Sequence, residues 1–359
     1  MVKQEISEQV SDNPLDSDGL YPDPEQLLKK EVINLDILGK LVGKSILSVD
    51  QFDKAMVLEI CKMAALLEST EIAKCHPLDG KIVVTAFFEP STRTRLSFES
   101  AVLRLDGKII SIPGEKSTGV AKGESLSDIG EMFNAYGDIV VMRHTETDAL
   151  DEILQNLRIP LINAGNGSGE HPTQSLADWF AILKWKPELG RNTNHINKIH
   201  LGILGTPGSM RAVNSFLRMS LLFKDGIKKL SIVSELADPL GPELEQQLKE
   251  SCIDFKITND INEVVSDLDV IYMNSIAFLG DSYKSLDSRF KLNKESKLKE
   301  DAVVLHPLAR LDELDPILDS TTHNLYFTQA HGAVFIRQAL FIAVLNRFNK
   351  LPKEEIPFN

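Results

Sequence analysis

The chain has few cysteines and no long apolar run. Its 359 residues include only Cys61, Cys75 and Cys252, which are too few and too far apart for a disulfide framework or a CxxC metal pair. No apolar stretch reaches the roughly 18 residues that a membrane-spanning helix needs. The segment after Met1 is polar and acidic, unlike a signal peptide. We therefore expect a cytoplasmic protein with no membrane partner.

Basic residues are outnumbered as well. The chain has 39 Lys and Arg against 52 Asp and Glu, which gives a formal net charge of −13 at pH 7. A nucleic-acid-binding surface needs a basic face that displaces counterions from the phosphates. We therefore expect no nucleic-acid partner, and an enzyme that acts on small anions remains open.

Short apolar runs alternate with helix-like stretches along most of the chain. The apolar runs are 82–88, 139–142, 160–162, 199–204, 230–233, 270–273 and 303–305. The helix-like stretches are 48–67, 93–104, 125–135, 174–185, 211–223, 242–250 and 332–348. Continuous apolar runs fit strands that are buried on both faces of a parallel sheet, joined by right-handed crossovers. This predicts an α/β fold with two doubly wound parallel-sheet domains.

A stretch rich in Pro, Gly and Asn at 186–198 separates the strands into two groups. The predicted organisation is an acidic N-terminal extension at 1–44, a first domain at 45–186, a second domain at 187–330 and a C-terminal helix at 331–350 that returns to the first domain. Ligands of open α/β sheets bind beyond the carboxyl ends of the strands. We therefore expect the functional site between the two domains.

The most informative segment is Ser91-Thr92-Arg93-Thr94-Arg95, which leads from the first apolar run into a helix. The first turn of a helix offers free N–H groups and the positive end of the helix dipole. The three hydroxyls of this run, together with the Arg93 guanidinium, would complete a phosphate cradle. The alternative, a simple N-cap, needs only one hydroxyl and leaves the other side chains unexplained.

Two further strand ends carry polar groups. Arg143 follows the run 139–142, and His171 and Gln174 stand where a helix should start after a glycine-rich loop. A lone histidine at a helix start usually has a structural role. Three strand ends that present Arg93, Arg143 and His171 are better explained by one shared anion.

These runs, 91–95 and His171-Pro172-Thr173-Gln174, resemble the two signatures of the aspartate/ornithine carbamoyltransferase family. The resemblance covers roughly residues 45–350 and is strongest to the aspartate-specific members. It implies transfer of the carbamoyl group of carbamoyl phosphate to the amino group of L-aspartate, giving N-carbamoyl-aspartate and phosphate in pyrimidine biosynthesis. It also implies that neither metal nor organic cofactor is needed, which agrees with the lack of a Cys/His ligand cluster.

The resemblance implies a role for each matching residue. Residues 91–94 would hold the phosphate, while Arg143, His171 and Gln174 would contact the carbamoyl group. Arg93, Thr94, Arg143 and His171 are the expected catalytic residues; the last three would donate to the oxygen that becomes negative in the tetrahedral state.

The segment 117–124 resembles the family's mobile loop, which a neighbouring subunit of a trimer supplies. Thr118 and Lys122 match its binding positions, with Lys122 as a flexible point charge for the phosphate. Taken alone, the segment would be interpreted as a solvent-exposed basic turn flanked by glycines. The resemblance therefore implies a homotrimer with shared active sites and leaves a higher assembly open.

The acceptor side resembles the family less closely. Arg211 matches the arginine that holds an amino-acid carboxylate, and Leu308 lies in a His-Pro-Leu turn whose following proline is Ala309 here. Aspartate enzymes carry an Arg and a Gln for the side-chain carboxylate at the positions of Ser275 and Ala277. A neutral hydroxyl cannot replace a bidentate guanidinium.

This departure leaves alternatives open. Another cation could bind the side-chain carboxylate, and Lys284, Arg289 and Lys291 lie downstream. The acceptor could instead be a different carboxylate-bearing amine or amide. A catalytically silent binding or assembly paralogue is a third reading, disfavoured because such a subunit has no need of an intact phosphate cradle.

Overall fold

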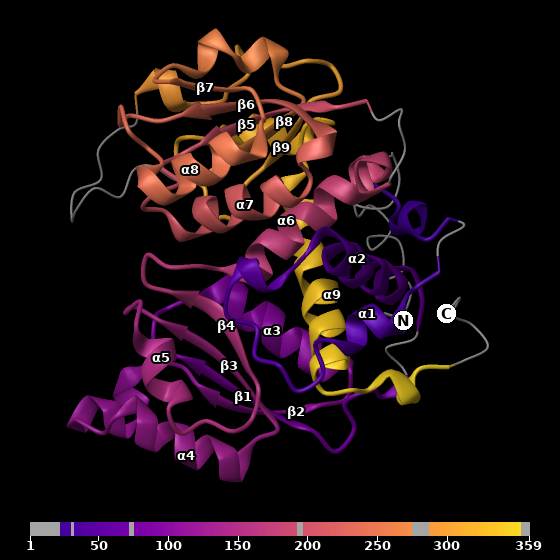
Figure 1. Cartoon of the computed structure of the whole chain (residues 1–359), viewed down its shortest axis with the longest axis vertical. Helices are drawn as coiled ribbons and strands as arrows, with labels where there is room; N and C mark the ends of the chain where they lie inside the picture. The colour runs from indigo at the N-terminus through magenta and orange to yellow at the C-terminus, as the bar shows by residue number, and fades with distance from the viewer. Residues whose placement is uncertain (1–21, 30–31, 72–74, 192–196, 275–286, 353–359) are drawn as a thin grey trace, which may run out of the picture.

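The computed structural model describes residues 22–29, 32–71, 75–191, 197–274 and 287–352. Two parallel sheets lie in separate halves of the molecule (Figure 1). The first sheet has the order β2-β1-β3-β4, with β1 Ile82–Phe87, β2 Lys108–Ile112, β3 Ile139–His144 and β4 Leu161–Asn166. The second has the order β7-β6-β5-β8-β9, with β5 Ile199–Leu204, β6 Ile227–Val233, β7 Phe255–Thr258, β8 Val270–Met273 and β9 Val303–Leu305. The predicted α/β class with two parallel sheets is confirmed.

Helices connect the strands and cover both sheets. In the described residues they are α1 Leu35–Gly39, α2 Lys54–Ser69, α3 Thr92–Arg104, α4 Leu126–Tyr136, α5 Ala149–Leu154, α6 Pro172–Trp185, α7 Arg211–Leu222, α8 Gly241–Ser251 and α9 Tyr326–Val344. None of them is both long and apolar enough to cross a membrane.

Strand β1 shows why the first sheet is covered on both faces. Val83 and Phe87 belong to an apolar cluster with residues of α2, α3, α6 and α9, whereas Val84 and Ala86 belong to another with α4 and α5. Successive side chains of a strand point to opposite faces. A continuous apolar run is therefore what two covered faces require.

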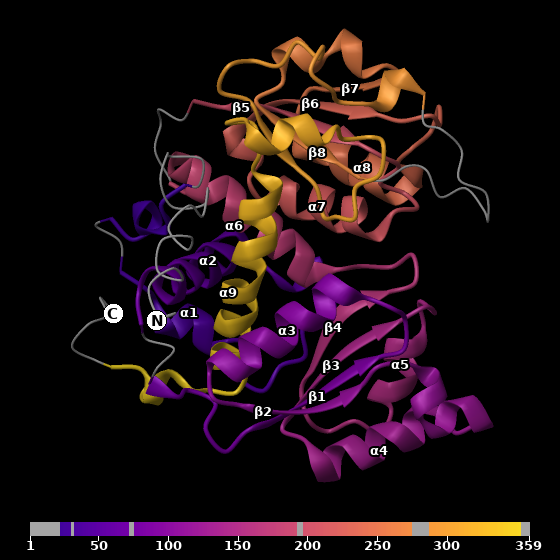
Figure 2. The same ribbon diagram turned by 180° about the vertical axis from the view of Figure 1, so that it is seen from behind.

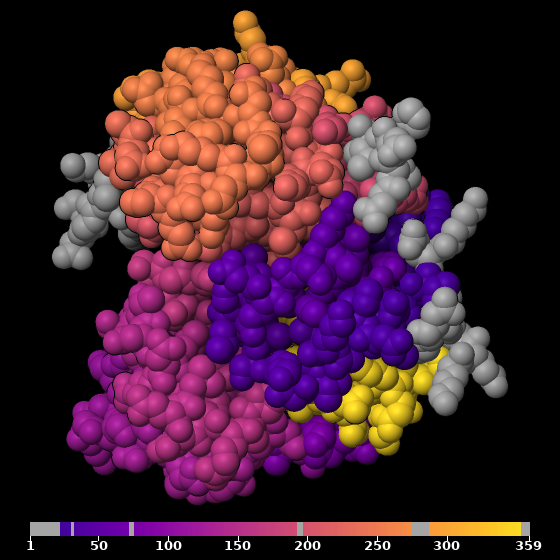
Figure 3. Space-filling view, in the orientation of Figure 1, coloured from indigo at the N-terminus to yellow at the C-terminus, as the bar shows by residue number. Residues whose placement is uncertain are grey.

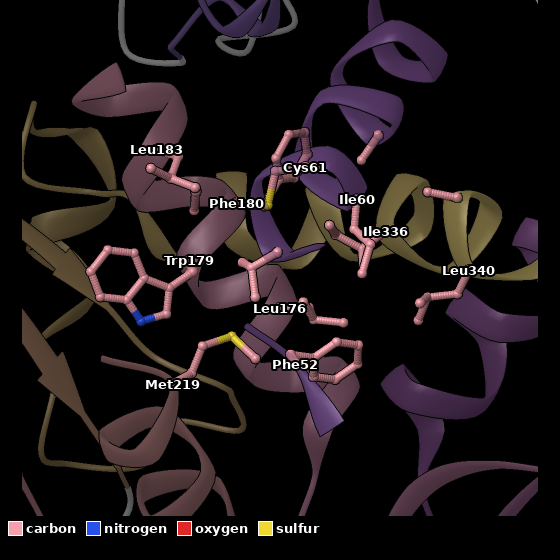
Figure 4. Close-up of a cluster of buried hydrophobic side chains, with 14 of the residues drawn as sticks. Phe52, Ile60, Cys61, Leu176, Trp179, Phe180, Leu183, Met219, Ile336 and Leu340 are labelled. Carbon is pink, nitrogen blue, oxygen red and sulfur yellow. The ribbon is translucent and has the colours of Figure 1, made fainter. Parts of the chain in front are cut away.

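Helices α6 and α9 connect the two halves. Helix α9 follows the last strand of the second sheet but packs against α2, α3 and α6 beside the first sheet (Figure 2). Helix α6 packs on α7, where the Trp179 ring stacks on Phe223 with centroids 3.9 Å apart. Side chains of α2, α6, α7 and α9 meet in one apolar cluster (Figure 4). The space-filling view shows that the two halves of the molecule touch each other (Figure 3).

The sequence analysis did not predict two strands, β2 and β7. β2 and β7 each lie at one edge of their sheet, and most of their residues are exposed or only partly buried. β4 and β9, at the opposite edges, are buried. An edge strand with an open face carries polar residues such as Lys108 and Lys256. It therefore lacks the continuous apolar run by which the central strands are detected.

The described part of the predicted N-terminal extension packs onto the core. Ile33 and Leu38 are buried. The backbone N–H of Asn34 donates to Glu59 Oε2 at 2.8 Å, which ties this segment to α2. Residues 1–21 and 30–31 of the extension lie outside the described residues.

Candidate active site

A cavity of about 980 Å³ lies between the two halves of the molecule. Its wall combines the carboxyl ends of β1, β3 and β4 and the first turns of α3 and α6 with residues from the second half. The sequence-predicted residues that line it are Ser91, Thr92, Arg93, Thr94, Arg143, His171, Gln174, Arg211 and Leu308. The fold thus brings together residues that are more than 200 positions apart in the chain.

The first turn of α3 forms one wall of the cavity. Ser91 occupies the N-cap position, yet its side chain makes no capping hydrogen bond. Its hydroxyl therefore remains available to a ligand, as do the N–H groups at the start of the helix. In the described part of the chain, the guanidinium of Arg93 has no hydrogen bond or ion pair, and Thr94 is buried. This wall offers several donors to an anion and no acidic group.

Glu89 bridges two arginines across the cavity. Its Oε1 lies 2.9 Å from Arg143 Nη2, and both of its carboxylate oxygens lie 3.0 Å from Arg211 Nη2. Burial would raise the pKa of Glu89, but the hydrogen bonds and charges of Arg211 and Arg143 hold it below the ordinary value. Glu89 is therefore ionised at neutral pH and holds both guanidiniums side by side.

Two glycines, one near the end of β4 and one directly after it, permit this arrangement. Gly165 has φ +113, and a Cβ there would lie 3.3 Å from Arg211 Nε and 3.4 Å from Arg143 Nη1. The carbonyl of Gly167, which has φ +47, accepts a hydrogen bond from Arg211 Nη1 at 2.8 Å. Both glycines adopt left-handed conformations that side chains disfavour. The backbone can thus approach both arginines closely.

His171 stands at the N-cap of α6 with its imidazole in the cavity wall. Its backbone N–H donates to Ser215 Oγ of α7 at 2.9 Å, whereas neither ring nitrogen has a hydrogen-bond partner among the described residues. Burial lowers the pKa of His171 well below its ordinary value, and the positive charges of Arg143, Arg211 and Arg337 lower it further. The ring is therefore neutral at pH 7 and can donate one hydrogen bond without carrying a charge.

We expect the His171 ring to stay neutral at pH values well below about 6.5, the usual pKa of histidine. The unfolded chain takes up this proton near pH 6.5 and the folded chain does not, so His171 lowers the free energy of unfolding as the pH falls below that value. Nitrogen chemical shifts of histidine-labelled protein would measure the ring's protonation, with His171→Gln identifying its signal. A ring that titrates at or above pH 6.5 would contradict this electrostatic environment.

Leu308 lies in a turn that hydrogen bonds to buried residues hold in place. Its backbone N–H donates to His306 Nδ1 at 2.8 Å, and His306 Nε2 lies 2.9 Å from the buried carboxylate of Glu313. A ring nitrogen that accepts a backbone N–H cannot carry a proton, so Nε2 is the protonated nitrogen. This network orients the turn so that Pro307 and Leu308 line the cavity opposite α3.

Two family models match this chain over most of its length. The carbamoyl-P binding domain of aspartate/ornithine carbamoyltransferase matches residues 44–184, and the Asp/Orn binding domain matches residues 197–344. The chain belongs to the aspartate/ornithine carbamoyltransferase family. The resemblance inferred from the two sequence signatures is thereby confirmed.

Members of this carbamoyltransferase family resemble the chain along nearly their whole length. The aspartate carbamoyltransferase catalytic subunit of Methanobrevibacter smithii is 37% identical over 304 residues, which cover 83% of this chain and 93% of that protein. The catalytic subunit from Sulfurisphaera tokodaii is also 37% identical, covering 83% of this chain and 98% of its own length. Both relatives are named as transferases acting on aspartate.

Solved structures of the family share the fold. Aspartate transcarbamoylase from Trypanosoma cruzi in complex with carbamoyl aspartate and phosphate aligns with a TM-score of 0.75 and 29% identity, covering 89% of this chain and 99% of that one. The same enzyme in complex with aspartate and phosphate aligns with a TM-score of 0.76 and 30% identity, covering 86% and 96%.

Thr118 and Lys122 do not belong to the cavity of their own chain. Lys122 is the last residue of the short 3₁₀ segment Gly119–Lys122, and Thr118 lies between this segment and the 3₁₀ segment Glu115–Ser117. Neither residue lines the cavity. Lys122 is exposed. The Thr118 hydroxyl donates to the carbonyl of Glu115 at 2.8 Å. Within one chain the structure thus leaves this pair apart from the other predicted residues.

Two of the predicted acceptor-binding residues, Ser275 and Ala277, lie outside the described residues, as does Lys284. Asn274, the last residue described before them, lines the cavity. The described chain thus reaches the cavity wall at Asn274, directly before the two predicted residues.

The other two downstream cations do not line the cavity. Arg289 Nη2 lies 3.0 Å from an oxygen of Asp287, and Lys291 Nζ lies 2.7 Å from an oxygen of Asp312. Each already has an acidic partner. Their placement offers no substitute for the missing arginine.

Sequence reasoning missed Glu89 and Arg337. Glu89 directly precedes the phosphate motif, but nothing in the sequence says that it faces two arginines. Arg337 lies in α9, is 2% exposed and donates to the Ser97 hydroxyl, and burial lowers its pKa to about 9. An arginine in the middle of the mostly apolar stretch 332–345 was the available signal, because an arginine is rarely buried without a partner.

Proposed function

We propose that this protein transfers the carbamoyl group of carbamoyl phosphate to the amino group of L-aspartate, giving N-carbamoyl-aspartate and phosphate, as in pyrimidine biosynthesis. One observation carries the proposal: the uncapped first turn of α3 with Arg93 faces Arg143, His171 and Arg211 across a single cavity. An enzyme that joins two anionic substrates needs such a concentration of donors. The names of the relatives agree with this activity.

The roles proposed for the first half come from the family resemblance, and the placement of these residues around one cavity supports them. Residues 91–94 bind the phosphate, which leaves as an anion already surrounded by helix N–H groups and Arg93. Thr94, Arg143 and His171 donate hydrogen bonds to the carbonyl oxygen as it becomes negative. The lowered pKa of His171 suits this role, because the neutral ring donates one hydrogen bond and its other nitrogen is too weak a base to take the proton of the attacking amine. Gln174 contacts the amide end of the carbamoyl group.

The second half binds the acceptor. Arg211 holds the α-carboxylate of aspartate, and the carbonyl of Leu308 approaches its amino group. Glu89 now occupies both Arg143 and Arg211, so a substrate anion competes with Glu89 for these guanidiniums. Ser275 and Ala277 remain the predicted neighbours of the side-chain carboxylate. Holding amine and carbonyl together between the two halves supplies much of the acceleration.

The organisation around the site is part of the proposal. Residues 45–186 form the carbamoyl phosphate-binding domain and 187–330 the amino-acid-binding domain, with the helix at 331–350 returning to the first. The active unit is a cytoplasmic homotrimer in which Thr118 and Lys122 of one subunit complete the site of the next. The exposure of Lys122 outside its own cavity supports this sharing.

The activity is tested by phosphate release from carbamoyl phosphate in the presence of different amines. We expect L-aspartate to give a faster rate than L-ornithine, because the side-chain ammonium of ornithine is repelled by an arginine-rich cavity. L-asparagine measures how much the side-chain carboxylate contributes, since Ser275 and Ala277 replace the Arg and Gln that would bind it. Arg93→Ala protein measures the background. A faster rate with another carboxylate-bearing amine would favour the alternative acceptor, and no rate with any amine would favour a silent paralogue.

A further inference from the structure

A buried residue behind the cavity wall fixes the orientation of the Gln174 side-chain amide. Gln174 lies in the first turn of α6 and lines the cavity. One turn along the same helix, the side chain of Asp178 is fully buried and accepts a hydrogen bond from Gln174 Nε2 at 2.7 Å. Both this hydrogen bond and that of Gln329 end on Oδ1, which is an acceptor whether the carboxyl is ionised or carries its proton on Oδ2. It therefore selects the amide nitrogen and leaves Gln174 Oε1 as the atom for a ligand.

The same carboxylate holds a second amide. Gln329 of α9 is buried, and its Nε2 donates to Asp178 Oδ1 at 2.5 Å. The other end of this amide, Oε1, accepts the backbone N–H of His306 at 2.9 Å. Asp178 is thus connected through Gln329 to the turn that presents Leu308 on the opposite side of the cavity.

Stability alone does not account for Asp178. Burial raises its pKa to about 7, against the hydrogen bonds of Gln174 and Gln329. No Lys, Arg or His forms an ion pair with it in the described ranges. A buried carboxylate without a cation is costly, and an apolar side chain of similar volume would pack at least as well. What an apolar residue could not do is orient two amides.

We propose that Asp178 is a positioning residue for both substrates: it turns Gln174 Oε1 toward the NH₂ of the carbamoyl group and, through Gln329, holds the His306–Leu308 turn against the acceptor. The inference rests on the proposed function, because the carbamoyl NH₂ is the donor that Gln174 Oε1 would accept. Asp178 itself touches neither substrate.

Calorimetry with carbamoyl phosphate on the full chain tests the first connection. We expect Asp178→Ala and Gln174→Ala each to raise Kd about tenfold, equivalent to one hydrogen bond of about 1.4 kcal/mol. The double variant should bind no more weakly than Gln174→Ala alone, because Asp178 acts through Gln174. Asp178→Asn should stay within about threefold of wild type, since its amide oxygen can accept the same two hydrogen bonds.

Glu68→Ala is the matched control. It removes a buried ion pair with Lys184, also on α6, in which Nζ lies 2.8 Å from the carboxylate. We expect a lower melting temperature and an unchanged Kd. Equal Kd values for wild type and Asp178→Ala, additive effects in the double variant, or an equal loss of affinity in Glu68→Ala would overturn the inference. If wild type itself fails to bind carbamoyl phosphate, the proposed function fails instead.

Gln329→Ala tests the second connection and covers the case in which Asp178→Ala does not fold. We expect the KM for L-aspartate to rise several-fold while the Kd for carbamoyl phosphate stays unchanged, because the turn loses its hydrogen bond to Gln329 whereas Gln174 keeps its hydrogen bond to Asp178. An unchanged KM for L-aspartate, or an equal loss of affinity for both substrates, would refute the proposal that Asp178 acts on the His306–Leu308 turn through Gln329.

Discussion

Replacing Arg93 with alanine is expected to reduce carbamoyl phosphate binding below detection while leaving the fold intact. Arg93 lies at the cavity wall in the first turn of α3 and, in the regions that the structure describes, pairs with no other side chain. The folded chain therefore loses no internal bond. A bound phosphate that loses a charged partner in a covered site loses about 2–5 kcal/mol, which corresponds to roughly thirtyfold to several thousandfold in Kd.

Calorimetry with carbamoyl phosphate and thermal unfolding would measure the two effects separately. Arg95→Ala is the matched control, since it removes the same type of side chain from the same helix at a position that does not line the 980 Å³ cavity. We expect Arg95→Ala to bind nearly as wild type and both variants to unfold close to the wild-type temperature. Wild-type affinity in Arg93→Ala would show that the phosphate is held elsewhere.

Mixing two inactive variants, Lys122→Ala and His171→Ala, is expected to restore about one quarter of wild-type activity. His171 belongs to the cavity of its own chain, whereas Lys122 is exposed and does not line it. In a closed ring, each site takes His171 from one subunit and Lys122 from its neighbour. With random exchange, half of the subunits supply an intact His171 and half of their neighbours an intact Lys122, so about one site in four is complete.

Native mass spectrometry would verify that subunits have exchanged before activity is measured. Each variant mixed with itself gives the baseline, and Lys116→Ala, an exposed lysine in the same region, should remain active alone. No recovery after verified exchange would mean that the sites are not shared. Full activity of Lys122→Ala alone would remove this lysine from the site altogether.

The central strands were predictable because burial on both faces requires continuous apolar runs. The runs 82–88, 139–142 and 199–204 became β1, β3 and β5, and helices followed them closely. The edge strands β2 and β7 were not predictable in this way, because a strand with an open face keeps polar residues. What decides their structure is pairing with a neighbouring strand that the local sequence does not reveal.

The candidate site likewise has residues that the sequence predicts and residues that it does not. The donors of the phosphate wall are consecutive in the chain, so a strand end followed by a helix start was enough to predict their chemistry. Glu89, Arg337 and Asp178 carry no such local signature. Their partners Arg211, Ser97 and Gln329 lie more than 100 residues away in each case.

By itself the sequence determined the α/β class, the central strands and the anion-binding character of the first helix turns, because each depends on neighbouring residues and on simple periodicity. Only the tertiary structure decided which groups share the cavity, that His171 is neutral and that Glu89 occupies two arginines. These properties depend on burial and on charges brought together by helix packing. A group's electrostatic environment is set by its neighbours in space, and those neighbours come from distant parts of the chain.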